Sequence, residues 1–230
     1  CSLDLFNTSF LRRLGSIPPP HAVSASAGVT ALAVLEDRGL AAATISGTVE
    51  LFSASALLQY GPSKAFQTLH TTAFDPADPE AGYAKASALA VLEDKRLAVG
   101  VTRTEGGYVD FFNMSAFEPH GPINPFLSSA LAGDVVLSFA VLDENVLAAG
   151  SYDYVELFNA SAPTVLPLHT LSIGPLTSLA SMDDGGLAVG TEYGNVYLYR
   201  PQASGIPYHS VDTTIPNANP NAESVIGLAR

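Results

Sequence analysis

The sequence predicts an all-β protein, a β-propeller built from four-stranded antiparallel blades. Short apolar runs with alternating polarity recur along the 230 residues, turn-forming residues separate these runs, and helical periodicity of useful length is absent. Four strands in each unit, with units spaced by roughly 40 to 60 residues, are typical of propeller blades.

The first strand of each unit is an apolar alternating run that ends in an acidic turn. Complete units lie near residues 29–72, 86–131, 136–172 and 176–214. Asp side chains stabilise turns by accepting hydrogen bonds from nearby backbone, and the ligand spacing of a calcium loop is absent. We therefore interpret the pairs as structural turns, with calcium or a basic partner as the alternative. The pairs are Glu36-Asp37, Glu93-Asp94, Asp143-Glu144 and Asp183-Asp184.

The remaining strands of each unit follow in a fixed order. A run of small residues, Leu-Ala-x-Gly or Leu-Ala-Ala-Ala, predicts a second strand that allows close sheet packing. After a second turn, an aromatic third strand is predicted at 48–52, 108–112, 154–158 and 195–199. A weaker fourth strand is expected in each long connection, at 66–71, 125–131, 167–171 and 208–213.

The two ends of the chain match parts of a further unit. Residues 2–7 align with 48–53, so the chain opens on a third strand, and 10–17 is expected to be the outer strand beside it. Residues 224–229 match a first strand. About five blades are therefore visible, four complete and one made from the termini (1–17 and 224–230). We expect residues 1–230 to form a single propeller domain and to be a fragment of a longer chain.

The unit resembles the WD40 repeat over nearly the whole chain. Val-Glu-Leu-Phe at 49–52 and 155–158 stands where that family has Val-x-Leu-Trp, although the chain has no Trp and lacks the family's Gly-His pair. The Ser/Thr–His–Asp–Trp network that the resemblance implies is therefore incomplete, and cohesion between blades is expected to depend on apolar packing. The residues at the Trp position are Phe6, Phe52, Phe112, Phe158 and Tyr199.

Composition excludes several classes of function. The net charge of -12 argues against binding to nucleic acid or to an anionic membrane, because such binding needs clustered Lys and Arg. Apolar runs fall short of the ~20 residues that span a membrane, and a single cysteine allows no internal disulfide. The net negative charge is compatible with a soluble protein, with cationic partners or with calcium binding.

Three N-x-S/T sequons recur at one repeat position, at the end of the third strand. They begin at Asn7, Asn113 and Asn159. Two interpretations stay open: N-glycosylation, which requires a secreted protein, or Asn and Ser/Thr that close a turn. Glycosylation predicts an extracellular or cell-surface location, and the alternative is cytoplasmic.

The sequence contains no nucleophile elbow, Cys–His pair or phosphate-binding loop, and no cofactor is expected. The five histidines have no zinc-site spacing, so no metal is expected either; His70 and His169 are expected at matching repeat positions.

The leading hypothesis is a non-enzymatic scaffold that binds other proteins, or copies of itself, through its faces and loops. The loops at 73–85 and 216–223, rich in Pro, Asp and Asn, are candidate binding surfaces. The alternative is a lectin that stacks sugars on tyrosines, and a glycan hydrolase or lyase is less favoured. The candidate platform residues are Tyr60, Tyr83, Tyr152 and Tyr193.

Overall fold

The computed structural model describes residues 2–5, 21–37, 39–57, 62–72, 85–114, 123–142, 145–160, 167–200 and 209–213. These residues form five β-sheets and one single-turn helix, α2 (Ala54–Leu57). Four sheets have four strands each, and the fifth has three. The prediction of an all-β protein with four-stranded antiparallel units is confirmed at this level.

We number the four-stranded sheets 1 to 4 along the chain. Sheet 1 contains β3 (Val29–Val34), β4 (Leu40–Thr44), β5 (Thr48–Phe52) and β7 (Gln67–His70). Sheet 2 contains β8 (Lys85–Val91), β9 (Arg96–Arg103), β10 (Gly106–Asn113) and β11 (Leu127–Ala130). Sheet 3 contains β12 (Ser138–Leu142), β13 (Val146–Gly150), β14 (Tyr154–Asn159) and β15 (Pro167–Ser172). Sheet 4 contains β16 (Leu176–Ser181), β17 (Leu187–Thr191), β18 (Val196–Arg200) and β19 (His209–Thr213).

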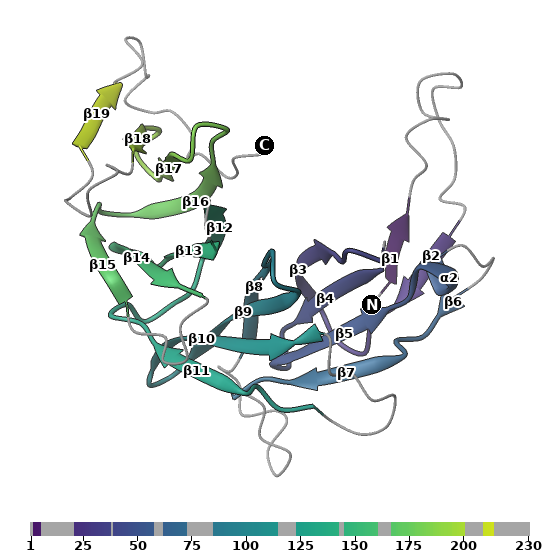
Figure 1. Cartoon of the computed structure of the whole chain (residues 1–230). Helices are drawn as coiled ribbons and strands as arrows, with labels where there is room; N and C mark the ends of the chain where they lie inside the picture. Colours follow the sequence, from purple (N-terminus) through teal and green to yellow (C-terminus); the bar gives the residue numbers. More distant parts are fainter. Residues whose placement is uncertain are drawn as a thin grey trace, which may run out of the picture.

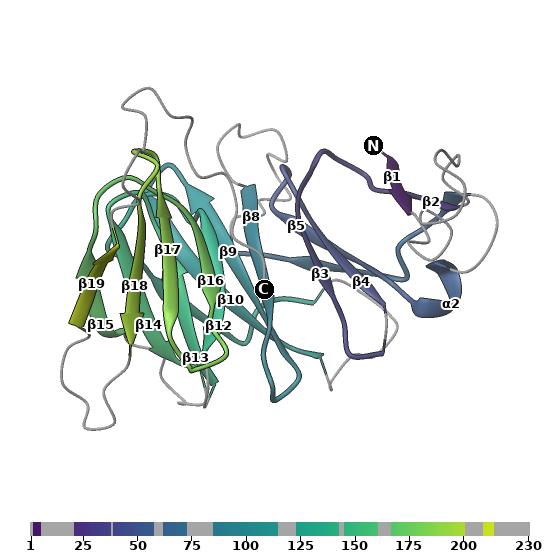
Figure 2. The same ribbon diagram turned by 90° about the horizontal axis from the view of Figure 1, so that it is seen from above.

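The sheets follow one another along an open arc (Figure 1). First strands lie on its inner side, where β8 contacts both β3 and β12, and β12 contacts β16. Fourth strands lie on its outer side, and the strands of sheets 3 and 4 stand side by side when the molecule is turned (Figure 2). All pairings within these four sheets are antiparallel, and the described sheets form an arc that is not a closed ring.

The hydrophobic core lies between neighbouring sheets. In sheets 2 to 4 the aromatic residue at the end of the third strand packs against the preceding sheet: Phe112 contacts sheet 1, Phe158 contacts sheet 2 and Tyr199 contacts sheet 3. The small residues of the second strands allow this approach, because Ala43 and Ala98 are completely buried at the same interfaces. Apolar packing thus joins the sheets, as expected from the missing Trp network.

The outer strands are also joined from sheet to sheet. Within the connection from β5 to β7, β6 (Pro62–Ser63) pairs in parallel with β2 (His21–Ser24). Ile123 occupies the same place before β11; it forms a parallel bridge with Leu69, and its carbonyl accepts a hydrogen bond from the amide of His70 at 2.9 Å. These two connections therefore cover the edges of the preceding outer strands, which would otherwise present unpaired backbone groups.

The N-terminal sheet has the order β1-β2-β6, where β1 (Ser2–Leu5) pairs with β2. The strand beside β1 is therefore at 21–24, downstream of the predicted range 10–17, which lies outside the described residues, as does 224–230. The parallel partner β6 was not predicted. The N-terminal part thus forms a three-stranded sheet in which a segment from the next unit takes part.

Candidate functional site

The antiparallel order of the strands divides the turns between two faces of the arc. The turns between first and second strands lie beside the ends of the third strands, because Asn113 pairs with Arg96 and Asn159 pairs with Val146. We call this side the sequon face. The pocket face is the opposite side, formed by the turns between second and third strands and by the loops that lead from one sheet to the next.

Asn113 and Asn159 lie at the ends of β10 and β14, and their side chains are exposed on the sequon face. The structure therefore brings both to equivalent, accessible positions. Asn7 lies outside the described residues, as do Ser115 and Ser161 of the other two sequons. The equivalent position in sheet 1 is Ser53, whose hydroxyl accepts a hydrogen bond from the amide of Ala56 and caps helix α2.

The acidic turns have a structural role where they are described. The carboxylates of Asp37, Asp94 and Asp184 each accept a hydrogen bond from the backbone amide two residues later, at 2.9, 3.3 and 3.2 Å. This is the local side-chain to backbone pattern that stabilises turns. Lys95 also forms an ion pair with Glu36 at 3.5 Å. The remaining pair, Asp143-Glu144, lies outside the described residues.

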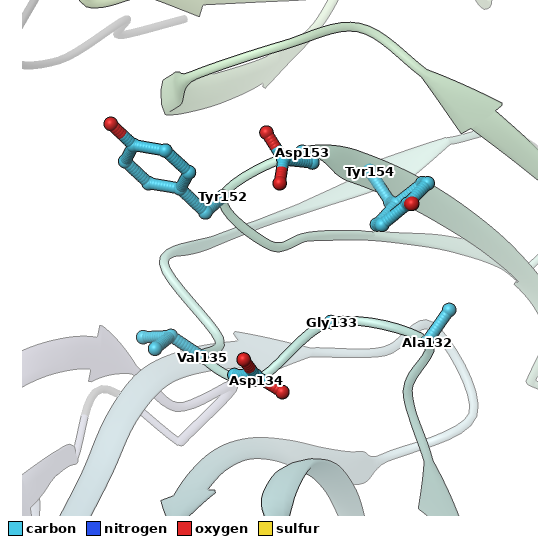
Figure 3. Close-up of a pocket in the computed structure, with 7 residues that line it drawn as sticks. All are labelled: Ala132, Gly133, Asp134, Val135, Tyr152, Asp153 and Tyr154. Carbon is cyan, nitrogen blue, oxygen red and sulfur yellow. The ribbon is translucent and has the colours of Figure 1, made fainter.

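A pocket of about 320 Å³ opens on the pocket face between sheets 2 and 3. One wall is the loop from β11 to β12, and the other is the turn from β13 to β14 (Figure 3). Asp134 and Asp153 lie on opposite walls, and both are exposed. The lining residues are Ala132, Gly133, Asp134, Val135, Tyr152, Asp153 and Tyr154.

Backbone hydrogen bonds hold both walls of the pocket. The carbonyl of Gly133 accepts a bond from the amide of Gly107 at 3.0 Å, which ties the loop to sheet 2. The carbonyl of Tyr152 accepts one from the amide of Leu176 at 2.8 Å, which ties the turn to the first strand of sheet 4. The pocket is therefore fixed by elements of three sheets.

Two candidate platform residues, Tyr152 and Tyr193, lie in equivalent turns of sheets 3 and 4 and are exposed. The hydroxyl of Tyr152 donates a hydrogen bond to Glu192 at 3.0 Å. That bond and the Glu192 charge raise the pKa of Tyr152, so its hydroxyl stays protonated at neutral pH. Tyr60 and Tyr83 lie outside the described residues.

The pocket face of sheets 3 and 4 is strongly anionic. The chain has no Lys or Arg from Thr104 to Tyr199, and Asp134, Asp153 and Glu192 are exposed within that stretch. Carboxylates beside tyrosine rings can accept hydrogen bonds from ammonium or guanidinium groups, and the ring faces attract the same cations. The arrangement therefore suits a positively charged ligand.

Sequence reasoning missed Asp134 and Asp153 as binding residues. Two signals could have indicated them: the long stretch without cationic residues, and the recurrence of an exposed aromatic or acidic residue in the turns after second strands. The pocket itself joins segments from two sheets, so no local pattern marks it.

The prediction that His70 and His169 occupy matching repeat positions was wrong, because the two residues pair with different positions of the third strand. His70 pairs with Thr48, whereas His169 pairs with Leu157, and the residue equivalent to His70 in sheet 3 is Ser172, which pairs with Tyr154. The described part of the chain contains no group of three or more potential metal ligands. Within the same residues, no helix is long and apolar enough to span a membrane.

Comparisons with known proteins indicate the fold alone. No protein-family model matches the chain, and no curated protein is similar enough in sequence to count as a relative. Among solved structures, 591 chains match, so the architecture is widespread. A chain in the crystal structure of a mitotic checkpoint complex is similar to this one with a TM-score of 0.61 and 18% identity, over 88% of this chain and 54% of that chain. The chain thus spans about half the length of the one it matches.

Proposed function

We propose that this chain is part of a WD40-like β-propeller and acts as a non-enzymatic protein-interaction scaffold. Repeated four-stranded sheets, apolar packing between sheets, and the likeness to a chain of a multiprotein complex support this proposal. In such a scaffold the sheets provide a rigid frame, and the loops on one face provide the binding surface.

The observation that carries the proposal is the pocket between sheets 2 and 3, with acidic groups on both walls. Asp134 and Asp153 lie across this pocket, Tyr152 is exposed beside them, and cationic residues are absent from the surrounding stretch 104–199. The field of such a surface attracts cations and repels anions. The partner is therefore proposed to be a protein segment rich in Lys or Arg.

Titration with a fluorescent oligo-lysine peptide tests this proposal. We expect binding that weakens with added salt and that falls at least about tenfold in the double variant Asp134→Asn/Asp153→Asn. The matched control is Asp183→Asn/Asp184→Asn on the sequon face, which removes the same charge. Equal affinities for the two variants would show that net charge alone attracts the peptide and that the pocket is not its binding site.

The finer proposal for the fold is a ring of about five blades. Leu32 and Val34 of β3 are 50% and 71% exposed. The equivalent residues of β8, Leu89 and Val91, pack against sheet 1. A preceding blade with its own first and second strands would cover Leu32 and Val34 in the same way.

The proposed setting is an extracellular or cell-surface glycoprotein. The exposure of Asn113 and Asn159 at equivalent strand ends supports this proposal, because an acceptor Asn must be accessible to be modified.

A carbohydrate-binding function is the second candidate. Tyr152 and Tyr193 are both exposed in neighbouring turns beside the carboxylate of Glu192, and aromatic rings with adjacent polar groups are suited to sugars. A glycan array tests this alternative: specific hits that disappear in Tyr152→Ala would favour it over the protein scaffold, and an array without hits would reject it.

A further inference from the structure

A buried carboxylate recurs at one position of three third strands. Glu50, Asp110 and Glu156 each follow the Val of a Val-acid-apolar-Phe motif, and these residues are 4%, 0% and 3% exposed. In the part of the chain that the structure describes, none of the three forms an ion pair with Lys or Arg. Burying a carboxylate without an ion pair is costly unless hydrogen-bond donors compensate, so the donors to these carboxylates are informative.

All three carboxylates accept a hydrogen bond from a backbone amide at one position of the preceding sheet, and hydroxyl groups such as those of Thr72 and Thr170 donate to two of them as well. Glu50 accepts a hydrogen bond from the amide of Ser26 at 2.9 Å, and Asp110 accepts one from that of Thr72 at 2.6 Å. The amide of Ala132 donates to Glu156 at 2.8 Å.

The donors occupy one position in the repeat. Ser26, Thr72 and Ala132 each lie two residues beyond the end of an outer strand: β2 ends at Ser24, β7 at His70 and β11 at Ala130. The same contact is thus made at three successive junctions.

This amide is the first part of the loop that leads into the next sheet. Outer strands end at the edge of a sheet, where the following amides would otherwise face water or remain unpaired. A carboxylate on the third strand of the next sheet reaches this point because the packing of the two sheets brings them together. The contact therefore fixes both where the loop leaves one sheet and how the next sheet sits against it.

Sheet 4 departs from this pattern. The position equivalent to Glu156 is Tyr197, and the residue two beyond the end of β15 is Gly174, at a φ of 90°. The junction is joined through other groups, including the hydrogen bond from the amide of Glu192 to the carbonyl of Pro175 at 2.9 Å. Loss of the acid thus coincides with a different loop conformation, so the acid and the loop geometry vary together.

We propose that the third-strand carboxylate is a positioning residue that holds the inter-sheet loop of the pocket face. Glu156 is the most informative case, because its donor, Ala132, lines the pocket between sheets 2 and 3. Glu156 thereby sets the position of the pocket wall without lining the pocket. This role concerns the geometry of the loop and is independent of which ligand the pocket binds.

Amide hydrogen exchange of Ala132 in the intact chain tests this role. In Glu156→Ala, we expect protection of the Ala132 amide to fall at least about tenfold, while amides in the centres of β13 and β14 keep theirs. Glu156→Gln keeps a carbonyl acceptor at the same reach and is expected to restore most of the protection. Unchanged protection in Glu156→Ala would overturn the proposal, and so would a uniform loss over all of sheet 3, which would indicate a general loss of stability.

A second variant keeps the test valid if Glu156→Ala fails to fold. Glu156→Met keeps a side chain of similar length and volume but has no oxygen that can accept a hydrogen bond from the amide of Ala132. We expect this variant to lose protection at Ala132 as Glu156→Ala does. Protection equal to that of the unaltered protein would overturn the proposal, because the carboxylate would then not be what holds the loop.

Discussion

The backbone amide of Thr72 donates a hydrogen bond to the carboxylate of Asp110 at 2.6 Å, across the junction between sheets 1 and 2. The hydroxyl of Thr72 donates to the other oxygen of the same carboxylate at 2.9 Å. Burial raises the pKa of Asp110; hydrogen bonds from Ser128 and Thr72 and the Arg103 charge offset part of this effect.

The raised pKa of Asp110 predicts a pH dependence of stability. The folded state binds this proton more tightly than the unfolded state, so the contribution of Asp110 is most favourable below the unfolded pKa of about 4 and is lost as pH rises through the folded pKa. Relative to Asp110→Asn, the unaltered protein should therefore lose stability as pH rises through that window. Denaturant unfolding of both proteins at a series of pH values measures the difference. A relative gain in stability with rising pH would mean that the pKa is lowered.

Removing the hydrogen-bond acceptor at position 110 should lower the stability of the fold more than removing only its charge. Asp110→Ala leaves the amide and hydroxyl of the half-buried Thr72 without this partner, whereas Asp110→Asn keeps one carbonyl oxygen. We expect Asp110→Ala to be less stable than Asp110→Asn by about 1–3 kcal/mol at neutral pH. Equal stability of the two variants would show that water readily replaces the carboxylate.

The close approach of the loop from β11 to β12 to sheet 2 predicts a coupled pair. A Cβ at Gly100 would collide with the side chain of Val136 and lie 3.1 Å from the Cβ of Ala88. Gly100→Ala should therefore destabilise the fold by about 1–3 kcal/mol. In the background of Val136→Ala the same substitution should destabilise the fold clearly less, because the colliding Cγ1 of Val136 is gone. A double-mutant cycle by denaturant unfolding measures this coupling, and strict additivity would contradict it.

The pattern of the sheets was predictable because each signal was local. Phe112 and Phe158, predicted at the Trp position of the repeat, are fully buried between sheets. All four predicted fourth strands overlap an observed strand: β7, β11, β15 and β19. These elements follow from alternation and turn residues, which the chain carries within each unit.

Features that depend on two sheets were not predictable in this way. The pairing of β6 with β2 is imposed by the neighbouring sheet, because a two-residue segment has no periodicity of its own. His169 pairs with Leu157 as Gln67 pairs with Leu51, so it lies three residues before the equivalent of His70, and only the pairing with the third strand shows this. The pocket arises where a loop and a turn from different sheets meet, so its acidic residues are distant in sequence.

The exposed face of β3 gives a direct test of the proposed ring. If an adjoining blade covers this face in the intact protein, Leu32→Asp should destabilise it as strongly as Leu89→Asp, by several kcal/mol. The two leucines occupy the same repeat position, so each variant controls for the other. Thermal unfolding measures both. If Leu32→Asp leaves the unfolding temperature unchanged while Leu89→Asp lowers it, the face of β3 is not covered by another blade.

The proposed glycosylation predicts a mass increase on the natural protein. Peptide mapping should find hexose-rich mass on the peptides that contain Asn113 and Asn159, because both side chains are exposed. Each of the substitutions Asn113→Gln and Asn159→Gln should remove one such increment. Unmodified peptides at both positions would contradict the extracellular proposal and would favour the interpretation that these residues close the turns at the strand ends.

Chemical-shift mapping with the oligo-lysine peptide tests the central claim most directly, since it locates binding on the molecule. The account predicts that the largest amide shifts fall on Ala132 to Val135 and Tyr152 to Tyr154, on the two walls of the pocket. The turn at Asp183–Gly186 on the sequon face should change little, although it is also acidic. Shifts centred on that turn, or spread evenly over all acidic residues, would contradict a binding site on the pocket face.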